Sequence, residues 1–160
     1  MDLRTIFAYA LQREIEGKKF FEENAGRFGH AAVVGVFKNL ALEEQKHIEF
    51  IQNQLKVLGS NEGGTAEDLA ATDFFMHGAA LEKIDQTVLE SFVPALPVLR
   101  MAYLIERDFA EFYEKAAGRT EGKPREALMM LASWERGHEK LFQTLHDRTF
   151  EEYAHMPWGG

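Results

Sequence analysis

The sequence predicts an all-α protein, a four-helix bundle whose second and third helices are joined by a long connection. Apolar residues recur at three- and four-residue spacings in four separate segments, which is the pattern of a helix with one buried face. Glycine and proline residues bound these segments. The middle of each segment also carries glutamate or histidine on its apolar face, so four helices are expected to present ionisable groups at one common depth.

The first two helices are predicted from about Leu3 to Phe28 and from about Ala31 to Leu58. Gly26 and Gly29 mark the end of the first helix, because glycine favours helix termination. The polar, glycine-rich run of residues 59–64 stops the second helix. These two helices are expected to form an antiparallel hairpin.

Residues 59–93 form the predicted crossover, with short helices opening at Thr65 and spanning about Ala79 to Phe92. The segment is too long for a turn between neighbouring helices, so it is expected to cross the bundle from one end to the other. The second and third helices then run parallel. The aromatic run Phe74-Phe75-Met76 and Phe92 are expected to cap the bundle, with a dimer contact as the alternative.

The third helix is predicted to begin near Pro94 or Pro97, because proline suits the first turn of a helix, and to end near Ala117. The fourth is predicted from about Pro124 to Asp147. Residues 1–150 thus make one domain. The remaining residues, 151–160, are predicted to be a tail that docks loosely or is disordered.

Composition limits the possible partners of the chain. Its 160 residues carry a net charge of −8, which argues against nucleic acid or an anionic membrane surface, because phosphate binding needs clustered Lys and Arg. No apolar run approaches the ~18 residues that a membrane span needs. Asp2 and Arg4 argue against a signal peptide, and a cytoplasmic location is predicted. The absence of cysteine excludes disulfides, Cys-ligated zinc and iron–sulfur clusters.

The two predicted hairpins repeat one design. Residues 14–21 match residues 106–113, and residues 40–47 match residues 131–138. Glu14 and Glu44 are 30 residues apart, and Glu106 and Glu135 are 29 residues apart. Such self-similarity indicates two equivalent hairpins that face each other.

Metal binding is predicted from Glu44-x-x-His47 and Glu135-x-x-His138. An i, i+3 pair lies on one helix face about one turn apart, so each pair can reach one metal ion or two adjacent ions. Glu14 and Glu106 project inward from the other two helices. This mixture of carboxylate oxygen and imidazole nitrogen suits iron, manganese or zinc and is poor for calcium.

The bare Glu-x-x-His pattern is a weak signal, and two alternatives stand beside the metal hypothesis. The third instance, Glu152-x-x-His155, lacks apolar periodicity and is interpreted as coincidence. In a metal-free bundle, Lys18 or Arg100 would have to pair with the buried glutamates, because an unpaired buried charge costs several kcal/mol.

Several neighbours of the ligands are given simpler interpretations. Glu43 and Glu139 are expected on solvated helix faces, and Trp134 is expected to pack between helices, away from the ligands. Tyr103, one turn before Glu106, is expected in the core, with a hydrogen-bond or radical role at the site as the alternative.

With these residues in view, the chain resembles the ferritin-like di-iron carboxylate proteins, and among them the rubrerythrin-like branch. Residues 14–25 and 37–48, with their counterparts in the second hairpin, carry the resemblance, which covers about Leu3 to Asp147. The resemblance implies a dinuclear iron site bridged by Glu44 and Glu135. The implied ligands are Glu14, Glu44, His47, Glu106, Glu135 and His138.

The chain departs from the typical family pattern in two ways. It lacks the Cys-ligated rubredoxin centre, so the resemblance implies a separate electron-donor protein. It also carries Phe109 where the family typically has an additional glutamate, which leaves a symmetric set of four glutamates and two histidines.

The implied activity is that of a di-iron oxidoreductase that reduces hydrogen peroxide or dioxygen, as in defence against oxidative stress, and the bundle is expected to dimerise. An iron-oxidising or iron-handling protein is the first alternative, and a structural bundle with a vestigial site is the second.

Overall fold

The computed structural model describes residues 2–60 and 86–157, and all regular secondary structure within these ranges is helical. The all-α prediction is confirmed. The elements, in chain order, are α1 (Leu3–Ala25), α2 (Ala31–Ser60), the short α4 (Gln86–Ser91), the single 3-10 turn η2 (Val93–Ala95), α5 (Leu96–Ala117) and α6 (Gly122–His155).

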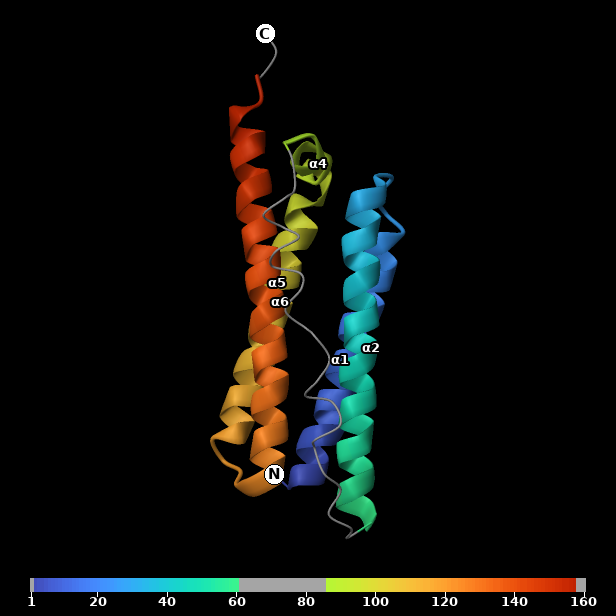
Figure 1. The fold of residues 1–160 in the computed structure, drawn as a ribbon, viewed down its shortest axis with the longest axis vertical. Coiled ribbons are helices and arrows are strands. Elements are labelled where there is room, and N and C mark those ends of the chain that lie inside the picture. Colours follow the sequence, from blue (N-terminus) through green and yellow to red (C-terminus); the bar gives the residue numbers. More distant parts are fainter. Residues whose placement is uncertain (1, 61–85, 158–160) are drawn as a thin grey trace.

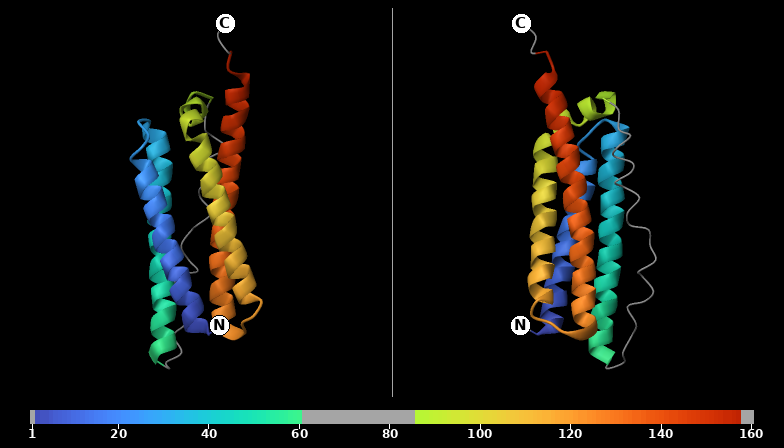
Figure 2. Two further views of the ribbon diagram at one scale, coloured as in Figure 1. Left: turned by 180° about the vertical axis from the view of Figure 1, so that it is seen from behind. Right: turned by 60° about the vertical axis from the view of Figure 1, so that its left-hand side comes forward.

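The four long helices form two antiparallel hairpins that lie side by side (Figure 1; Figure 2). Helix α1 packs mainly on α2, and α5 packs mainly on α6. Helices α2 and α5 run in the same direction, and α4 begins at the opposite end of the bundle from the end of α2 (Figure 1). The predicted crossover between the second and third helices is therefore confirmed.

Local hydrogen bonds define where the helices begin. The Asp2 carboxylate caps α1 by accepting the backbone N–H of Thr5 at 2.8 Å. The His30 ring nitrogen Nδ1 accepts the backbone N–H of Ala32 at 3.2 Å at the start of α2. Proline stands in the first turn of α5, and α6 opens at Gly122, whose φ of +66° is readily adopted only by glycine.

Helix α6 extends further than predicted. The sequence analysis ends it near Asp147, whereas the structure continues it to His155. Residues 148–155 contain neither glycine nor proline, so nothing stops the helix until Pro157. The end of α6 projects past the other helices (Figure 1). Residues 151–155, predicted to belong to the tail, are thus helical.

Some predictions fall partly or wholly outside the described residues. The short helix at Thr65 and the aromatic run of residues 74–76 lie in the undescribed range 61–85. The second predicted short helix is represented by α4, at Gln86–Ser91. Phe92, which directly follows α4, is fully buried.

The core consists of two apolar clusters separated along the bundle axis. The cluster near the α1–α2 turn is built around Phe21, Phe37, Leu99 and Phe142. The other is built around Phe7, Phe50, Tyr113 and Leu128. In all four long helices the middle turns lie between these clusters, so any group placed there is shielded from water at both ends. None of the described helices is both long and apolar enough to cross a membrane.

Candidate metal centre

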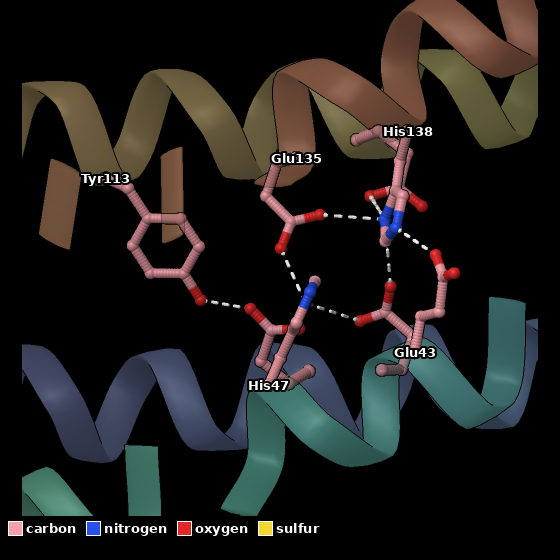
Figure 3. A network of polar contacts seen from close by, with 8 residues as sticks. Glu43, His47, Tyr113, Glu135 and His138 are labelled. Carbon is pink, nitrogen blue, oxygen red and sulfur yellow. Dashed lines mark hydrogen bonds and ion pairs between the residues drawn. The ribbon is translucent and has the colours of Figure 1, made fainter. Parts of the chain in front are cut away.

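The structure brings the six predicted ligands together in the layer between the two apolar clusters. Helix α1 supplies Glu14, α2 supplies Glu44 and His47, α5 supplies Glu106, and α6 supplies Glu135 and His138. All six side chains are buried, and the most exposed residue of the set is only 3% accessible. Four carboxyl groups and two imidazoles therefore meet inside the bundle (Figure 3).

The six residues form two overlapping groups, each with the donor atoms for one metal ion. One group consists of Glu14, Glu44, His47 and Glu135, and the other of Glu44, Glu106, Glu135 and His138. Within each group, one ligand atom from every residue lies within 4.8 Å of the others. Glu44 and Glu135 belong to both groups, which is the position that a bridging carboxylate takes between two ions.

Both imidazoles direct Nδ1 toward the carboxylates. Nδ1 of His47 lies 2.9 Å from Glu135 Oε1 and 3.2 Å from Glu14 Oε2. Nδ1 of His138 lies 3.5 Å from an oxygen of Glu44 and 3.5 Å from an oxygen of Glu135. The ring planes are nearly parallel, at 17°, with centroids 5.3 Å apart. The two rings thus lie next to each other, and each has Nδ1 close to an oxygen of Glu135.

The carboxylate oxygens fit metal binding better than a network of protein hydrogen bonds. Among the described residues, the buried oxygens of Glu44, Glu106 and Glu135 accept no hydrogen bond of good geometry, and the nearby donors are the imidazoles of the two other ligands, His47 and His138. Buried carboxylates without partners are costly, and coordination to a cation removes that cost. The donor set of four carboxylates and two imidazoles suits iron or manganese, and also zinc.

The alternative of glutamates paired with basic residues is not supported by the positions of the two candidates. The Lys18 ammonium donates to Gln45 Oε1 at 2.8 Å and lies 3.6 Å from Glu22, away from the buried layer. Arg100 is exposed.

Without metal, the six groups divide into protonated and ionised members. Burial raises the pKa of Glu14 and of Glu106, and the neighbouring carboxylates raise both further. Burial and Glu135 also act to raise the pKa of Glu44, but the imidazoles of His47 and His138 lower it to about 2. Burial likewise opposes ionisation of Glu135, whose pKa is nevertheless lowered, chiefly by His47.

The two histidines have the opposite response to the same surroundings. Burial acts to lower the pKa of His47 and of His138, yet the surrounding carboxylates raise both well above the usual value. These shifts favour the charged forms of the two imidazoles and of Glu44 and Glu135, and they favour the neutral forms of Glu14 and Glu106. Two divalent cations would balance all four carboxylates, so metal binding exchanges protons for metal ions.

Glu43 contradicts the expectation of a solvated position. It is only 7% exposed, and its Oε2 lies 2.7 Å from Nε2 of His138, on the ring edge opposite the metal-facing nitrogen (Figure 3). Glu43 precedes a ligand in sequence and so points about 100° from it, but α6 covers that side of α2. Glu139 is also mostly covered and pairs with Arg107 and Arg136.

The tyrosine in contact with the ligands is Tyr113, whereas Tyr103, for which a role at the site was the alternative to a core position, packs against an apolar cluster. The Tyr113 hydroxyl donates to Glu14 Oε1 across the bundle (Figure 3). Tyr103 is half-buried, and its ring lies 5.6 Å from that of His146. The sequence contains a signal for Tyr113, because it follows Glu106 by seven residues and therefore lies on the same helix face two turns away.

Trp134 packs between helices as predicted, but directly on a ligand. Its ring stacks on the His47 imidazole with a centroid distance of 5.0 Å and an interplanar angle of 12°. Phe50 meets the same indole edge to face at 5.3 Å. Trp134 does not share the face of the α6 ligands, as predicted. It nevertheless contacts a ligand of another helix, His47 of α2.

Gly17 and Phe109 fill equivalent positions in the two hairpins. Each follows the single glutamate ligand of its helix by three residues. A Cβ atom at Gly17 would lie 3.3 Å from the Phe109 ring and 3.5 Å from Glu44 Oε2. The missing side chain therefore leaves room for the phenylalanine ring beside the ligands.

The third Glu-x-x-His pair stays apart from the centre. Glu152 and His155 lie in the last turns of α6, and His155 is exposed with its Nδ1 2.6 Å from the Glu151 carbonyl oxygen. Neither residue belongs to the two ligand groups found among the described residues.

Comparison with known families agrees with this geometry. The rubrerythrin family model matches residues 5–146, which include α2 and α5 completely, most of α1 and α6, and all six buried ligands. Comparisons with curated proteins and with solved structures gave no significant match. The match extends over most of the 160 residues, and the chain belongs to the rubrerythrin family.

Proposed function

We propose that the protein binds two iron ions in the buried cluster and reduces hydrogen peroxide or dioxygen with electrons from a separate donor protein. The observation that carries the proposal is the pair of ligand groups that share Glu44 and Glu135. Membership of the rubrerythrin family supports iron as the metal, and manganese and zinc are the alternatives that the donor set accommodates.

The shared carboxylates suit two adjacent cations. Both have lowered pKa values, so they are ionised before metal arrives. Glu14 and Glu106 each serve one end of the cluster and give up their protons on binding. Bound to Glu14, Glu44, His47, Glu106, Glu135 and His138, two iron ions would supply the two electrons that, with two protons, reduce hydrogen peroxide to two waters.

Other residues hold the ligands in place and exclude bulk water. Burial raises the pKa of Tyr113, so its Oη keeps a proton and directs it at Glu14 Oε1. The two apolar clusters close the bundle above and below the ligands. A shielded site of this kind limits side reactions of a reduced centre.

An iron-oxidising or iron-handling role is the second candidate, favoured by the net charge of −8, which would attract cations. A bundle with a vestigial site is disfavoured by the presence of all six ligands. We further propose that the protein is a cytoplasmic homodimer, as the family resemblance suggests for dimerisation. Nucleic acid and membrane partners are not proposed, because the net charge is −8 and none of the described helices could span a membrane.

The test is stopped-flow mixing of the anaerobic, ferrous-loaded protein with hydrogen peroxide and, separately, with dioxygen. Oxidation that is much faster with peroxide, and repeated turnover when a reductant is supplied, would support the peroxidase. Faster oxidation by dioxygen, with iron retained beyond two ions per chain, would favour iron handling. Loaded protein that reacts with neither oxidant would contradict both functions.

A further inference from the structure

The two ends of the cluster have equivalent ligands but different surroundings. We infer that the two metal positions are unequal, and that the position of Glu106 and His138 takes up the first divalent cation because Glu43 backs the imidazole of His138. This inference rests on the proposed two-metal site. It concerns the order in which the two positions bind metal. Their ligand types alone would predict equal affinities.

The contact of Glu43 with His138 has the geometry of a carboxylate that supports a metal-bound histidine. Nε2 of His138 lies 2.7 Å from Glu43 Oε2, while Nδ1 of the same ring faces the ligand carboxylates (Figure 3). A proton on Nε2 donated to Glu43 leaves the Nδ1 lone pair directed at the metal position. Such a partner fixes the tautomer and makes the imidazole a stronger ligand.

The matching position in the other hairpin cannot do the same. Glu43 and Trp134 each immediately precede a shared glutamate, and each contacts the histidine of the opposite hairpin. The indole of Trp134 lies flat on His47 and has an N–H donor but no acceptor atom. It therefore orients the ring without adding negative charge beside it.

A second neighbouring residue, Tyr113, also favours metal binding at the Glu106–His138 position over the Glu14–His47 position. Tyr113 donates a hydrogen bond to Glu14 Oε1, and such a bond makes the carboxylate a weaker electron donor toward a cation. Phe21 occupies the matching position in α1 and has no hydroxyl group to donate to Glu106. At the Glu14–His47 end, the carboxylate therefore accepts a hydrogen bond from a neutral hydroxyl, and the residue that matches Glu43 is an indole.

The unequal binding can be measured with cobalt(II), which has visible absorption that reports its coordination. Titration of the metal-free protein should show two steps, a tight one followed by a weaker one. The spectrum of the wild-type protein at one equivalent should match that of His47→Ala saturated with cobalt, because that variant keeps the His138 position. His138→Ala should lose the tight step.

The variant Glu43→Gln tests the cause, because it removes the charge of Glu43 and nearly keeps its shape. The tight step should weaken about 10- to 100-fold, while the weaker step should change less than about twofold. Glu49→Gln is the matched control, since it makes the same chemical change at an exposed position of α2 and should leave both steps unchanged. Circular dichroism of the metal-free variants verifies that the helices are retained.

Two outcomes would overturn the inference alone. They are binding of two cobalt ions in a single step by the wild-type protein, and equal weakening of both steps by Glu43→Gln. A wild-type titration without saturation would overturn the inference together with the proposed two-metal function, so the two failures are distinguishable.

Discussion

The α1–α2 hairpin and the α5–α6 hairpin carry the same ligands at matching positions, and they differ in the residues beside those ligands. Each hairpin has one glutamate on its first helix and a Glu-x-x-His pair on its second. The residues next to these ligands differ between the two hairpins. Glu43 is matched by Trp134, Phe21 by Tyr113, and Gly17 by Phe109.

This comparison separates the requirements of metal coordination from those of the surrounding protein. The ligands must be alike, because each end of the cluster needs one imidazole, one carboxylate of its own and two shared ones. The neighbours have only to fill space and satisfy hydrogen bonds, so a small residue on one side can be offset by a large one on the other. Equal ligand sets therefore do not imply equal metal positions.

Removal of a shared carboxylate should have the largest effect, since both halves depend on it. Glu44→Ala or Glu135→Ala should reduce the iron content of anaerobically loaded protein to near zero, whereas Glu14→Ala or Glu106→Ala should spare the opposite position. Metal analysis after gel filtration measures the iron per chain. Glu152→Ala is the control, and the same iron content in it and in both shared-site variants would refute the ligand assignment.

The protons that replace the metal should make the stability of the metal-free protein depend on pH. Folded His47 and His138 have pKa values raised above 6.5, so they keep protons that the unfolded chain has lost at higher pH. For each such proton, the free energy of unfolding falls by about 1.4 kcal/mol for every unit by which the pH rises. Glu14 and Glu106, whose pKa values are raised, also make the protein less stable as the pH rises above 4.5. Glu44, whose pKa is lowered, affects stability only below pH 4.5, where it stabilises the protein as the pH rises.

Urea unfolding at several values between pH 6 and 9 checks this prediction. The metal-free protein should lose stability steadily over that range, and the metal-loaded protein should lose much less, because the metal has already displaced the protons. A parallel decline in the two forms would show that surface groups, and not the cluster, cause the effect.

Loss of the Tyr113 hydroxyl should produce a moderate effect that is confined to one half of the cluster. Tyr113→Phe leaves a buried oxygen of Glu14 without its donor, so the metal-free protein should lose about 1–3 kcal/mol of unfolding free energy. Tyr103→Phe should stay within about 0.5 kcal/mol and should leave metal binding intact. Urea unfolding measures both, and equal losses would argue against a special role of Tyr113.

The smallest effect is expected from a pair of glycine substitutions. Gly137→Ala in α6 meets no atom within 4 Å and should stabilise the protein by about 0.5–1 kcal/mol, because alanine loses less conformational entropy in a helix. Gly17→Ala should gain less, since its Cβ would press on the buried Phe109 ring at 3.3 Å. Thermal unfolding compares the two, and a larger gain at Gly17 would show that Phe109 moves freely.

The fold and the six ligands could be predicted from sequence because both follow from helix periodicity. Residues at i and i+3 must share a helix face. When all four helices carry charged residues at one level of their buried faces, few arrangements other than a metal site can compensate that charge. The crossover followed from the length of the segment between the second and third helices. The end of α6 was missed because the apolar pattern fades after Asp147, although no helix breaker occurs before Pro157.

The neighbours of the ligands depend on how the hairpins meet, and a single helix does not determine that. The pattern of α2 alone predicts a solvated Glu43, whereas in the folded bundle Glu43 is buried and contacts His138 of α6. Trp134 and Tyr113 likewise contact ligands from other helices. Comparison of the two repeats position by position would have identified all three as places where the halves differ.

The central claim is that the two hairpins together hold two metal ions, and anaerobic titration of the metal-free protein with ferrous iron tests it most directly. Saturation at two ions per chain, reduced to about one in both Glu14→Ala and Glu106→Ala, is the predicted result. Saturation at a single ion in the wild-type protein, or no saturable binding, would contradict it.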